Sequence, residues 1–392
     1  MKNILLVHNY YQIPGGEDTV VKNEKELLEK HGHKVVLYKR SNDEIKQMNL
    51  LGKLFLPFTA IFSLKTYKEV KRLIKAQRID VVHVHNTLTM VSPSVFCAAN
   101  VCKVPVVQTL HNFRMICPNG LFFCNGKVCE KCLEKGIGHA LKNNCYRNSK
   151  VQTLIVVLSM MFHRVIGTYK KANYICLTDF NKEKLLAKNS KIGFIHSNRV
   201  FVKPNFTYYK ADDDILVNRK RQGVFVGRIE EIKGIEALLE AWKDIKDVDL
   251  VMCGTGPLES RAKEYCEKNN MTNVHMLGFT AHDEVMKIIS ESEFLILSSL
   301  LYEGFPMTIT ESLACGTPVL CSDIGNLGSL VKSDFNGYKF KPGDAEDIRS
   351  AVGQMINCDH KEEMYYNCRN CFTENYSEEA NYQQLIQIYD RI

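Results

Sequence analysis

The strongest constraint on the fold is a strand-helix alternation that runs through the chain twice. In the first half, five β-branched runs predict strands, at Asn3–His8, Lys34–Tyr38, Val81–His85, Val106–Leu110 and Tyr174–Leu177. Helical patterns such as Thr19–His31 and Thr66–Gln77 lie between these runs. Such alternation is typical of a parallel sheet whose strands are joined by crossover helices.

The same alternation begins again after a polar, acidic stretch at Tyr208–Asn218. The second series predicts strands at Gly223–Val226, Asp249–Cys253, Val274–Leu277, Phe294–Leu297 and Pro318–Ser322, and helices at Gly234–Lys246, Leu258–Lys268 and Met307–Ala314. We therefore expect an α/β protein with two Rossmann-like, doubly wound domains, 1–207 and 223–372, joined by a linker at 208–222. A central cleft between the domains would bind ligands. We expect residues 373–392 to form a C-terminal helix that packs back on the N-terminal domain.

The charge differs sharply between the two halves. Residues 1–210 carry 33 Lys+Arg against 13 Asp+Glu, and residues 211–392 carry 18 against 31, which gives net charges of +20 and −13. This asymmetry indicates two domains with different partners, of which the basic one would face phosphates, nucleic acid or an anionic membrane. The hydrophobic content of 45% excludes a disordered or fibrous chain.

The 15 cysteines raise the question of the cellular compartment. The apolar run Ile4–Val7 is too short for a signal peptide, and we interpret it as a buried strand. We therefore expect a cytoplasmic protein, in which clustered cysteines indicate a metal site more often than disulfides. The apolar runs Leu54–Leu64 and Leu154–Phe162 are shorter than the roughly 18 residues that span a bilayer.

The segment Tyr302–Val319 contains the most informative motif. Glu303 lies in a Gly-Phe-Pro turn, and Glu311 follows eight residues later on the helix that the turn opens. That spacing is a little over two helical turns, so both carboxylates can face one cleft if the turn folds back. A carboxylate can bind a ribose diol, and Gly304 allows backbone N–H groups at a helix N-terminus to approach a phosphate or sugar. Two glutamates alone would be solvated side chains, but this context argues against that interpretation.

This segment resembles the E-x7-E motif of the retaining nucleotide-sugar glycosyltransferases of family 4, which have the GT-B fold. The resemblance implies that Glu311 binds the donor ribose and that Glu303 lies beside the donor sugar, with Gly304, Phe305 and Pro306 in the same donor-binding turn. It also implies that the leaving phosphate acts as the base. No cofactor is then required for catalysis.

Two further elements of the second half match motifs of the same family. The element that contains Arg228 and Lys233 resembles its Gly-Arg/Lys-Gly motif, whose cations neutralise the donor diphosphate. The chemistry agrees, because two cations stabilise the negative charge that develops on a leaving nucleoside diphosphate. Cys253–Pro257 follows a predicted strand and opens a helix, as phosphate-binding loops do, so Gly254 and Gly256 are candidate donor-binding residues.

The first half contains two motifs of the same kind. Gly15 and Gly16 lie between the first predicted strand and helix and resemble the family's glycine-rich loop, whose backbone reaches the donor phosphates. Glu17 and Asp18 follow at a helix N-terminus, where their charge is favourable, and are either acceptor-side residues or simple helix caps. His111 ends a predicted strand and resembles the family's His motif, which implies contact with the donor sugar.

Five cysteines fall within 29 residues of a Gly/Pro/Asn-rich loop at 117–145, spaced C-x6-C-x4-C-x2-C-x12-C. A C-x2-C pair with two further thiolates can close a tetrahedral zinc site, and an irregular loop of this length needs a cross-link. Our candidate ligands for a structural zinc ion are Cys117, Cys129, Cys132 and Cys145. Unrelated free thiols and an iron–sulfur cluster are the alternatives.

The segment Lys46–Lys75 mixes basic residues with large apolar and aromatic ones. This mixture fits an interfacial segment on an anionic leaflet, and a core helix with a charged outer face is the alternative. Pro57 predicts an interruption, so that the segment would form two helical pieces.

Together these features predict a retaining hexosyltransferase that moves a sugar from a UDP- or GDP-sugar to an acceptor hydroxyl. The candidate catalytic residues are His111, Arg228, Lys233 and Glu303. The expected acceptor is a glycan or a polyprenyl-diphosphate-linked sugar, in the biosynthesis of a capsule, O-antigen or exopolysaccharide at the inner face of the plasma membrane. A GT-B-like nucleotide-sugar epimerase and a basic nucleic-acid-binding protein are the alternatives. We expect no nucleic-acid partner, because the chain contains no RNA- or DNA-binding motif.

Overall fold

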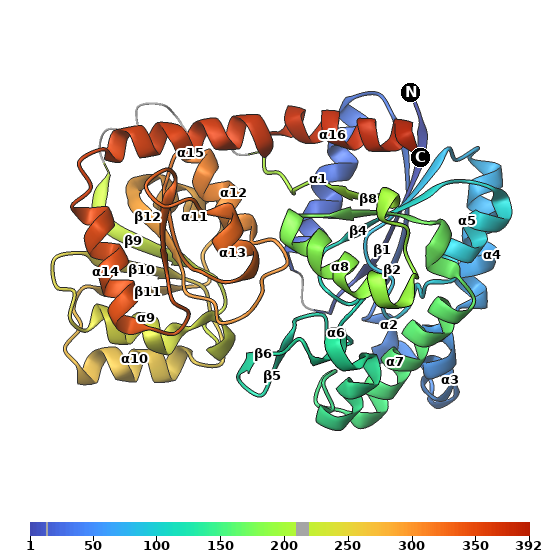
Figure 1. Cartoon of the computed structure of the whole chain (residues 1–392), viewed down its shortest axis with the longest axis horizontal. Helices are drawn as coiled ribbons and strands as arrows, with labels where there is room; N and C mark the ends of the chain where they lie inside the picture. Colours follow the sequence, from blue (N-terminus) through green and yellow to red (C-terminus); the bar gives the residue numbers. More distant parts are fainter. Residues whose placement is uncertain (13–14, 209–218) are drawn as a thin grey trace. The chain divides into compact units, whose positions relative to one another are not determined.

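The computed structural model describes residues 1–12, 15–208 and 219–392, which form two compact α/β units (Figure 1). The first unit comprises Met1–Cys124, Cys129–Pro204 and Asn381–Ile392, and the second comprises Asn125–Val128 and Asn205–Ala380. Residues 209–218 of the predicted linker lie outside the described residues.

A six-stranded parallel sheet forms the centre of the first unit. Its strand order is β2 (Lys34–Ser41), β1 (Asn3–Tyr10), β3 (Val81–Val84), β4 (Val106–Leu110), β7 (Asn173–Cys176) and β8 (Val200–Val202). All five predicted strands are present. The sixth strand, β8, has only three residues, which is too short to produce a recognisable pattern.

Helices on both sides of this sheet complete the first unit. The α-helices are α1 (Gly16–Lys30), α2 (Glu44–Gln47), α3 (Leu50–Ile61), α4 (Leu64–Ala76), α5 (Ser94–Cys102), α6 (Lys131–Lys135), α7 (Lys150–Val165), α8 (Asp179–Ile192) and most of α16 (Glu378–Arg391). Short 3-10 helices of this unit are η1 (Ile137–Asn143), η2 (Thr168–Lys171) and η3 (Ser197–Arg199). Within the cysteine-rich loop, a two-stranded hairpin pairs β5 (Phe123–Cys124) with β6 (Lys127–Val128).

The second unit contains another six-stranded parallel sheet. Its order is β11 (Val274–Gly278), β10 (Asp249–Cys253), β9 (Lys220–Val226), β12 (Ser292–Leu297), β13 (Val319–Ser322) and β14 (Gly337–Phe340). Its helices are α9 (Ile235–Trp242), α10 (Glu259–Lys268), α11 (His282–Glu291), α12 (Met307–Ala314), α13 (Gly325–Leu330), α14 (Ala345–Ile356), α15 (Lys361–Asn375) and the 3-10 helix η5 (Glu231–Lys233). The prediction missed β14, a four-residue strand that begins with a glycine.

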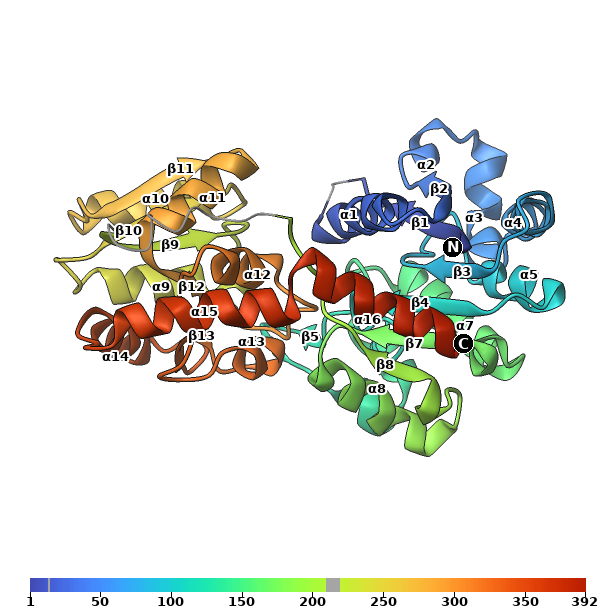
Figure 2. The same ribbon diagram turned by 90° about the horizontal axis from the view of Figure 1, so that it is seen from above.

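The helix α16 belongs to the core of the first unit although it follows the second unit in sequence. Leu385, Ile388 and Tyr389 are buried in one cluster with Ile4 and Val107 of the central strands. Figure 2 shows α16 lying over the first sheet. The first unit is therefore built from segments at both ends of the described chain.

The segment Lys46–Lys75 corrects one prediction. Pro57 lies inside the continuous helix α3, and the break between α3 and α4 falls at Phe62 and Ser63. The position of the break is explained by the Ser63 side chain, which accepts a hydrogen bond from the Thr66 N–H at 3.1 Å and so caps the N-terminus of α4. Within the described ranges, no helix has both the length and the apolar character that crossing a membrane requires.

Candidate functional site

Lys233 and Glu303, from two different motifs of the second unit, form an ion pair. The Lys233 Nζ donates to Glu303 Oε1 at 2.5 Å, and the Ser299 hydroxyl donates to the same oxygen at 2.6 Å. Burial alone would raise the pKa of Glu303, but the charge and hydrogen bond of Lys233 and the hydrogen bond from Ser299 outweigh it, so the pKa lies below its ordinary value. Glu303 is therefore an anion at neutral pH.

The turn that contains Glu303 is held by a residue that the sequence analysis missed. Asn326, which is fully buried, donates from its side-chain amide to the carbonyl oxygens of Glu303 at 2.5 Å and Gly304 at 2.7 Å. Phe305 is buried with its ring centroid 6.2 Å from that of Tyr376. These contacts fix the backbone of the turn just before α12, whose N-cap is Pro306. A lone Asn after a strand gives no signal that would distinguish it from a loop residue.

Glu311 is buried in α12 and contacts a second residue that no motif indicated. His282 Nε2 lies 3.2 Å from Glu311 Oε1. The hydrogen bond with Glu311 raises the pKa of His282, against the opposing effect of burial. The pair therefore places a carboxylate next to an imidazole that holds its proton to higher pH than usual.

The two predicted diphosphate-binding cations follow β9 and differ in exposure. The Arg228 side chain is 62% exposed and lies 3.4 Å from Glu230 Oε2, whereas the Lys233 side chain is 25% exposed and is held by Glu303. Arg228 can therefore reorient toward a ligand at little cost, and Lys233 is already positioned. Neither arrangement by itself tests contact with a donor.

Gly254 and Gly256 have a structural reason to be glycines. A Cβ on Gly254 would lie 1.9 Å from the Gly227 carbonyl oxygen, and one on Gly256 would lie 2.3 Å from the Ile229 carbonyl oxygen. The loop after β10 thus packs its backbone directly on the loop after β9. This packing accounts for both glycines without a ligand, so donor binding through them stays a prediction.

In the first unit, His111 at the end of β4 contacts a histidine that follows the neighbouring strand β3. His85 Nδ1 lies 2.9 Å from His111 Nε2. Burial lowers the pKa of His85 to about 4, and burial together with the nearby His85 lowers the pKa of His111 well below its ordinary value. Both imidazoles are therefore neutral at pH 7. They line a small cavity of about 80 Å³ together with Asn112 and Arg114.

A fully buried carboxylate on α1, Glu24, lies behind this histidine pair. Its oxygens lie 2.9 Å from His83 Nδ1, 3.4 Å from His85 Nε2 and 3.4 Å from Lys203 Nζ. Burial would raise the pKa of Glu24, but His83 and Lys203 outweigh it and hold that pKa well below its ordinary value. Glu24 is therefore a buried anion next to the histidines.

The same network reaches α16. The Tyr389 hydroxyl lies 2.7 Å from His83 Nδ1, and Lys203 Nζ donates to Asn381 Oδ1 at 2.9 Å. Ligand atoms of Glu24, His83 and His85 lie within 4.8 Å of one another, a spacing compatible with a metal ion. The Lys203 ammonium already compensates the charge of this carboxylate, so we interpret the group as a polar network.

The two acidic residues that follow the glycine-rich loop make different contacts. Asp18 accepts hydrogen bonds from the Gly15 N–H at 3.0 Å and from His8 Nε2 at 2.7 Å, so it caps α1, of which Gly16 is the first residue. Glu17 instead accepts a hydrogen bond from the Tyr11 hydroxyl at 3.2 Å. Burial raises the pKa of Glu17 to about 7, although the charges of His8 and Arg114 oppose the shift.

The five clustered cysteines lie close together as thiols. The Cys117 thiol donates a hydrogen bond to Asn119 Oδ1 at 2.9 Å. Cys117 and Cys132 lie close enough to shift one another's pKa values, and Cys124 adds to the effect of burial that raises the pKa of Cys145. Every cysteine in the described chain is free, and no three sulfur atoms there lie within 4.8 Å of one another. The predicted set omitted Cys124, which pairs with Cys145. The zinc site stays a prediction.

Two family models match the chain. The one described as glycosyl transferases group 1 matches residues 212–370, and the one described as Glycosyltransferase Family 4 matches residues 14–166. The chain is similar to the UDP-Gal:alpha-D-GlcNAc-diphosphoundecaprenol alpha-1,3-galactosyltransferase of Escherichia coli, with 24% identity over 79% of this chain and 75% of that protein. It is also similar to an uncharacterized protein in the cps region of Klebsiella pneumoniae, with 23% identity over 88% of this chain and 84% of that protein.

Solved structures show the same fold. The crystal structure of Anabaena HepE in complex with UDP covers 100% of both chains with a TM-score of 0.69 at 15% identity. At this identity the likeness establishes the arrangement of the chain and nothing about its ligands.

Proposed function

Because the chain belongs to glycosyltransferase family 4, a family of retaining enzymes with the GT-B fold, we propose that it is a hexosyltransferase. It would transfer a hexose from a nucleoside diphosphate hexose to an acceptor hydroxyl and retain the anomeric configuration of the donor. The observation that carries this proposal is the ion pair between Lys233 and Glu303. It joins two motifs 70 residues apart at the start of α12. A carboxylate and an ammonium held together in this way can bind the donor sugar and its diphosphate, respectively.

On the donor side, Lys233 and Arg228 would stabilise the charge of the departing diphosphate. Lys233 needs little reorganisation, because Glu303 already holds its ammonium at 2.5 Å. Glu311 would accept hydrogen bonds from the ribose hydroxyls, and its contact with His282 keeps the carboxylate oriented. The fixed turn around Gly304 supports backbone contacts to the sugar.

In the first unit, His111 would form a hydrogen bond with a hydroxyl of the donor sugar. Its neutral imidazole has one donor and one acceptor nitrogen, and the contact with His85 selects which nitrogen carries the proton. Glu24 in turn orients His85. The buried carboxylate thus acts on the sugar only through the histidines.

We infer a UDP-hexose as the donor and a lipid-diphosphate-linked glycan as the acceptor. The name of the Escherichia coli relative specifies UDP-Gal and a diphosphoundecaprenol-linked sugar, and the Anabaena structure contains UDP. The relative in the Klebsiella cps region supports a role in surface-polysaccharide assembly, which would place this enzyme at the inner face of the plasma membrane.

The test is transfer with a panel of UDP- and GDP-hexoses and a short lipid-diphosphate-linked acceptor, followed by NMR of the product. We expect release of one nucleoside diphosphate per sugar transferred and an anomeric configuration equal to that of the donor. Inverted product would contradict the proposal. Interconversion of the nucleotide sugar without an acceptor would instead favour the epimerase alternative.

We also propose that Cys117, Cys129, Cys132 and Cys145 hold a structural zinc ion. The Cys117 and Cys132 thiols already lie close together, and a tetrahedral site would bring all four sulfur atoms to about 4 Å from one another. Metal analysis of the purified protein should give about one equivalent of zinc, and Cys129→Ser should lose it. The buried Cys266, outside the cluster, provides the control Cys266→Ser. Less than about 0.2 equivalents in a folded protein would refute the site, since structural zinc binds tightly.

A further inference from the structure

Exposed hydrophobic side chains concentrate on two neighbouring helices of the first unit. Of the 21 large hydrophobic residues that are exposed in the described chain, 13 lie within 50–64 or 151–166. The helices α3 and α7 pack against each other there (Figure 1). Scattered exposed leucines need no explanation, but a concentration on adjacent elements indicates an interaction surface.

The helix α7 is apolar on both its faces. Thr153, Val156, Val157 and Met160 point into the unit. The outward positions repeat every three or four residues, as one face of a helix does, and are Val151, Leu154, Leu158, Met161, Phe162 and Val165, with exposures of 42–84%. A helix that is apolar all round is normally buried, so the outer face of α7 lacks the cover that its composition calls for.

The helix α3 presents the same kind of surface. Its exposed residues are Leu50, Leu51, Leu54, Phe55 and Phe58, with exposures of 57–84%, and its one fully buried residue is Ala60. A hollow of about 300 Å³ between α3 and α7 is lined by Lys53, Pro57, Arg147 and Ile155 among others. We call the exposed side chains of both helices the α3–α7 face.

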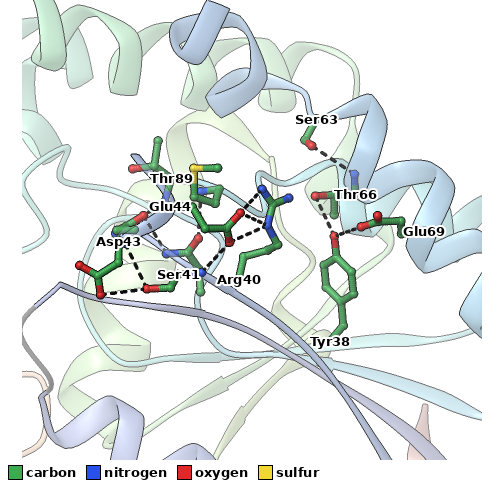
Figure 3. A network of polar contacts seen from close by, with 12 residues as sticks. Tyr38, Arg40, Ser41, Asp43, Glu44, Ser63, Thr66, Glu69 and Thr89 are labelled. Atoms are coloured by element: carbon green, nitrogen blue, oxygen red, sulfur yellow. Dashed lines mark hydrogen bonds and ion pairs between the residues drawn. The ribbon is translucent and has the colours of Figure 1, made fainter. Parts of the chain in front are cut away.

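The segment that carries α3 is braced at both ends against β2 (Figure 3). At one end, Arg40 donates three hydrogen bonds to the Glu44 carboxylate, the shortest at 2.7 Å. At the other end, the Tyr38 hydroxyl donates to Glu69 at 2.8 Å. The two acidic residues that flank this segment, Glu44 and Glu69, are thus hydrogen-bonded to β2 side chains.

The two sequence intervals that carry this face contain charges of one sign. No Asp or Glu occurs between Glu44 and Glu69 or between Glu134 and Asp179. The same intervals contain the exposed cations Lys53, Lys65, Lys68, Arg147 and Lys150. Exposed apolar side chains with cations in the same segments match the interface of an anionic bilayer, in which acyl chains lie below phosphate groups.

We propose that the α3–α7 face is the surface by which this protein docks on an anionic lipid bilayer. The inference rests on the proposed function for its biological setting, because a lipid-linked acceptor must be met at a membrane. It extends that function to two specific helices. Phe55, Phe58 and the exposed apolar side chains of α7 insert among acyl chains. Lys53 and Arg147 bind lipid phosphates.

The experiment is co-sedimentation of the full chain with vesicles of phosphatidylcholine alone and of equal parts phosphatidylcholine and phosphatidylglycerol. We expect binding to the anionic vesicles that weakens as salt is raised, since salt screens exposed charges. Phe55→Ser with Phe58→Ser, and separately Leu158→Ser with Met161→Ser, should weaken it by at least about tenfold. The control is Val101→Ser, which removes a side chain that is 56% exposed on α5 of the same unit.

Two double variants test whether vesicle binding requires positive charge. One is Lys53→Glu with Lys65→Glu, which reverses the charge, and the other is Lys53→Arg with Lys65→Arg, which keeps it. The first pair should lose the preference for anionic vesicles, and the second should keep it. All variants should transfer sugar to a water-soluble acceptor analogue as the wild type does, which separates this proposal from the proposed function. If the wild-type protein binds anionic vesicles but transfers no sugar, the docking surface is supported and only the proposed transferase function is rejected.

Three results would overturn the proposal. The first is wild-type protein that stays in the supernatant with anionic vesicles at low salt. The second is equal vesicle binding by the wild type and both apolar double variants. The third is that the wild type is a dimer, that Phe55→Ser with Phe58→Ser dissociates this dimer, and that neither protein binds vesicles. In that case a second copy of the chain would cover the face.

Discussion

At the scale of single residues, the pairing of Lys233 with Glu303 leads to a direct prediction. Lys233→Ala should lower turnover about 100-fold to 1,000-fold, because it removes a preorganised cation from the developing diphosphate charge. The circular dichroism spectrum should be unchanged. The control Lys263→Ala removes a similar ion pair with Glu259 at 2.8 Å on the surface of α10. Near-wild-type turnover in Lys233→Ala would contradict the role of this lysine.

Glu311 and His282 give a prediction for pH dependence. The hydrogen bond with Glu311 raises the pKa of His282, so the stability that this pair contributes is complete below the unfolded pKa of about 6.5. It is lost as the pH rises through the folded pKa. Glu311→Gln should move the NMR titration midpoint of His282 to lower pH and weaken binding of UDP. An unchanged midpoint would show that Glu311 does not hold the proton on His282.

At the scale of elements, the loops after β9 and β10 show that glycines in a short motif can also have a packing reason. Glycines that precede a helix suggested phosphate binding, yet the Ile229 carbonyl oxygen would lie 2.3 Å from a Cβ on Gly256. Gly256→Ala should therefore destabilise the second unit by several kcal/mol. Gly353→Ala within α14, where nothing lies within 4 Å, should instead stabilise it by up to about 1 kcal/mol. Urea unfolding of both variants checks the contrast, and a small effect of Gly256→Ala would leave ligand approach as the reason for that glycine.

The strands that sequence patterns could predict are those with short runs rich in β-branched or apolar residues. β4 (Val106–Leu110) and β10 (Asp249–Cys253) match their predicted bounds, whereas the three residues of β8 carry too little pattern. The break after α3 was misplaced because the Ser63 cap, not Pro57, decides it.

Candidate residues within motifs were predictable, but their supporting partners were not. Asn326, His282 and Glu24 act through contacts with residues 22 to 179 positions away in the chain. Such proximity arises where parallel strands end side by side, and local spacing does not encode it. A carboxylate on an otherwise buried helix face, as at Glu24, was the one signal available in advance.

At the scale of the whole molecule, the first unit depends on residues that follow the second. Leu385 of α16 is fully buried against the first sheet, so Leu385→Ala should cost about 2–5 kcal/mol of unfolding free energy. The exposed Gln387 on the same helix provides the control Gln387→Ala, which should change stability by less than about 0.5 kcal/mol. Calorimetry would detect the loss as a lower melting temperature for the first unit alone. An equal effect of both substitutions would show that α16 contributes little packing.

The discontinuous first unit also sets the order of events during synthesis. Its core lacks Leu385, Ile388 and Tyr389 until the ribosome has passed through all of the second unit, Asn205–Ala380. At 5–20 residues per second, that interval lasts roughly 10–35 s. During this time the apolar surface of the first sheet that α16 later covers is open to solvent and to chaperones. The second unit needs no residue beyond Ala380, so its chain is complete before that of the first.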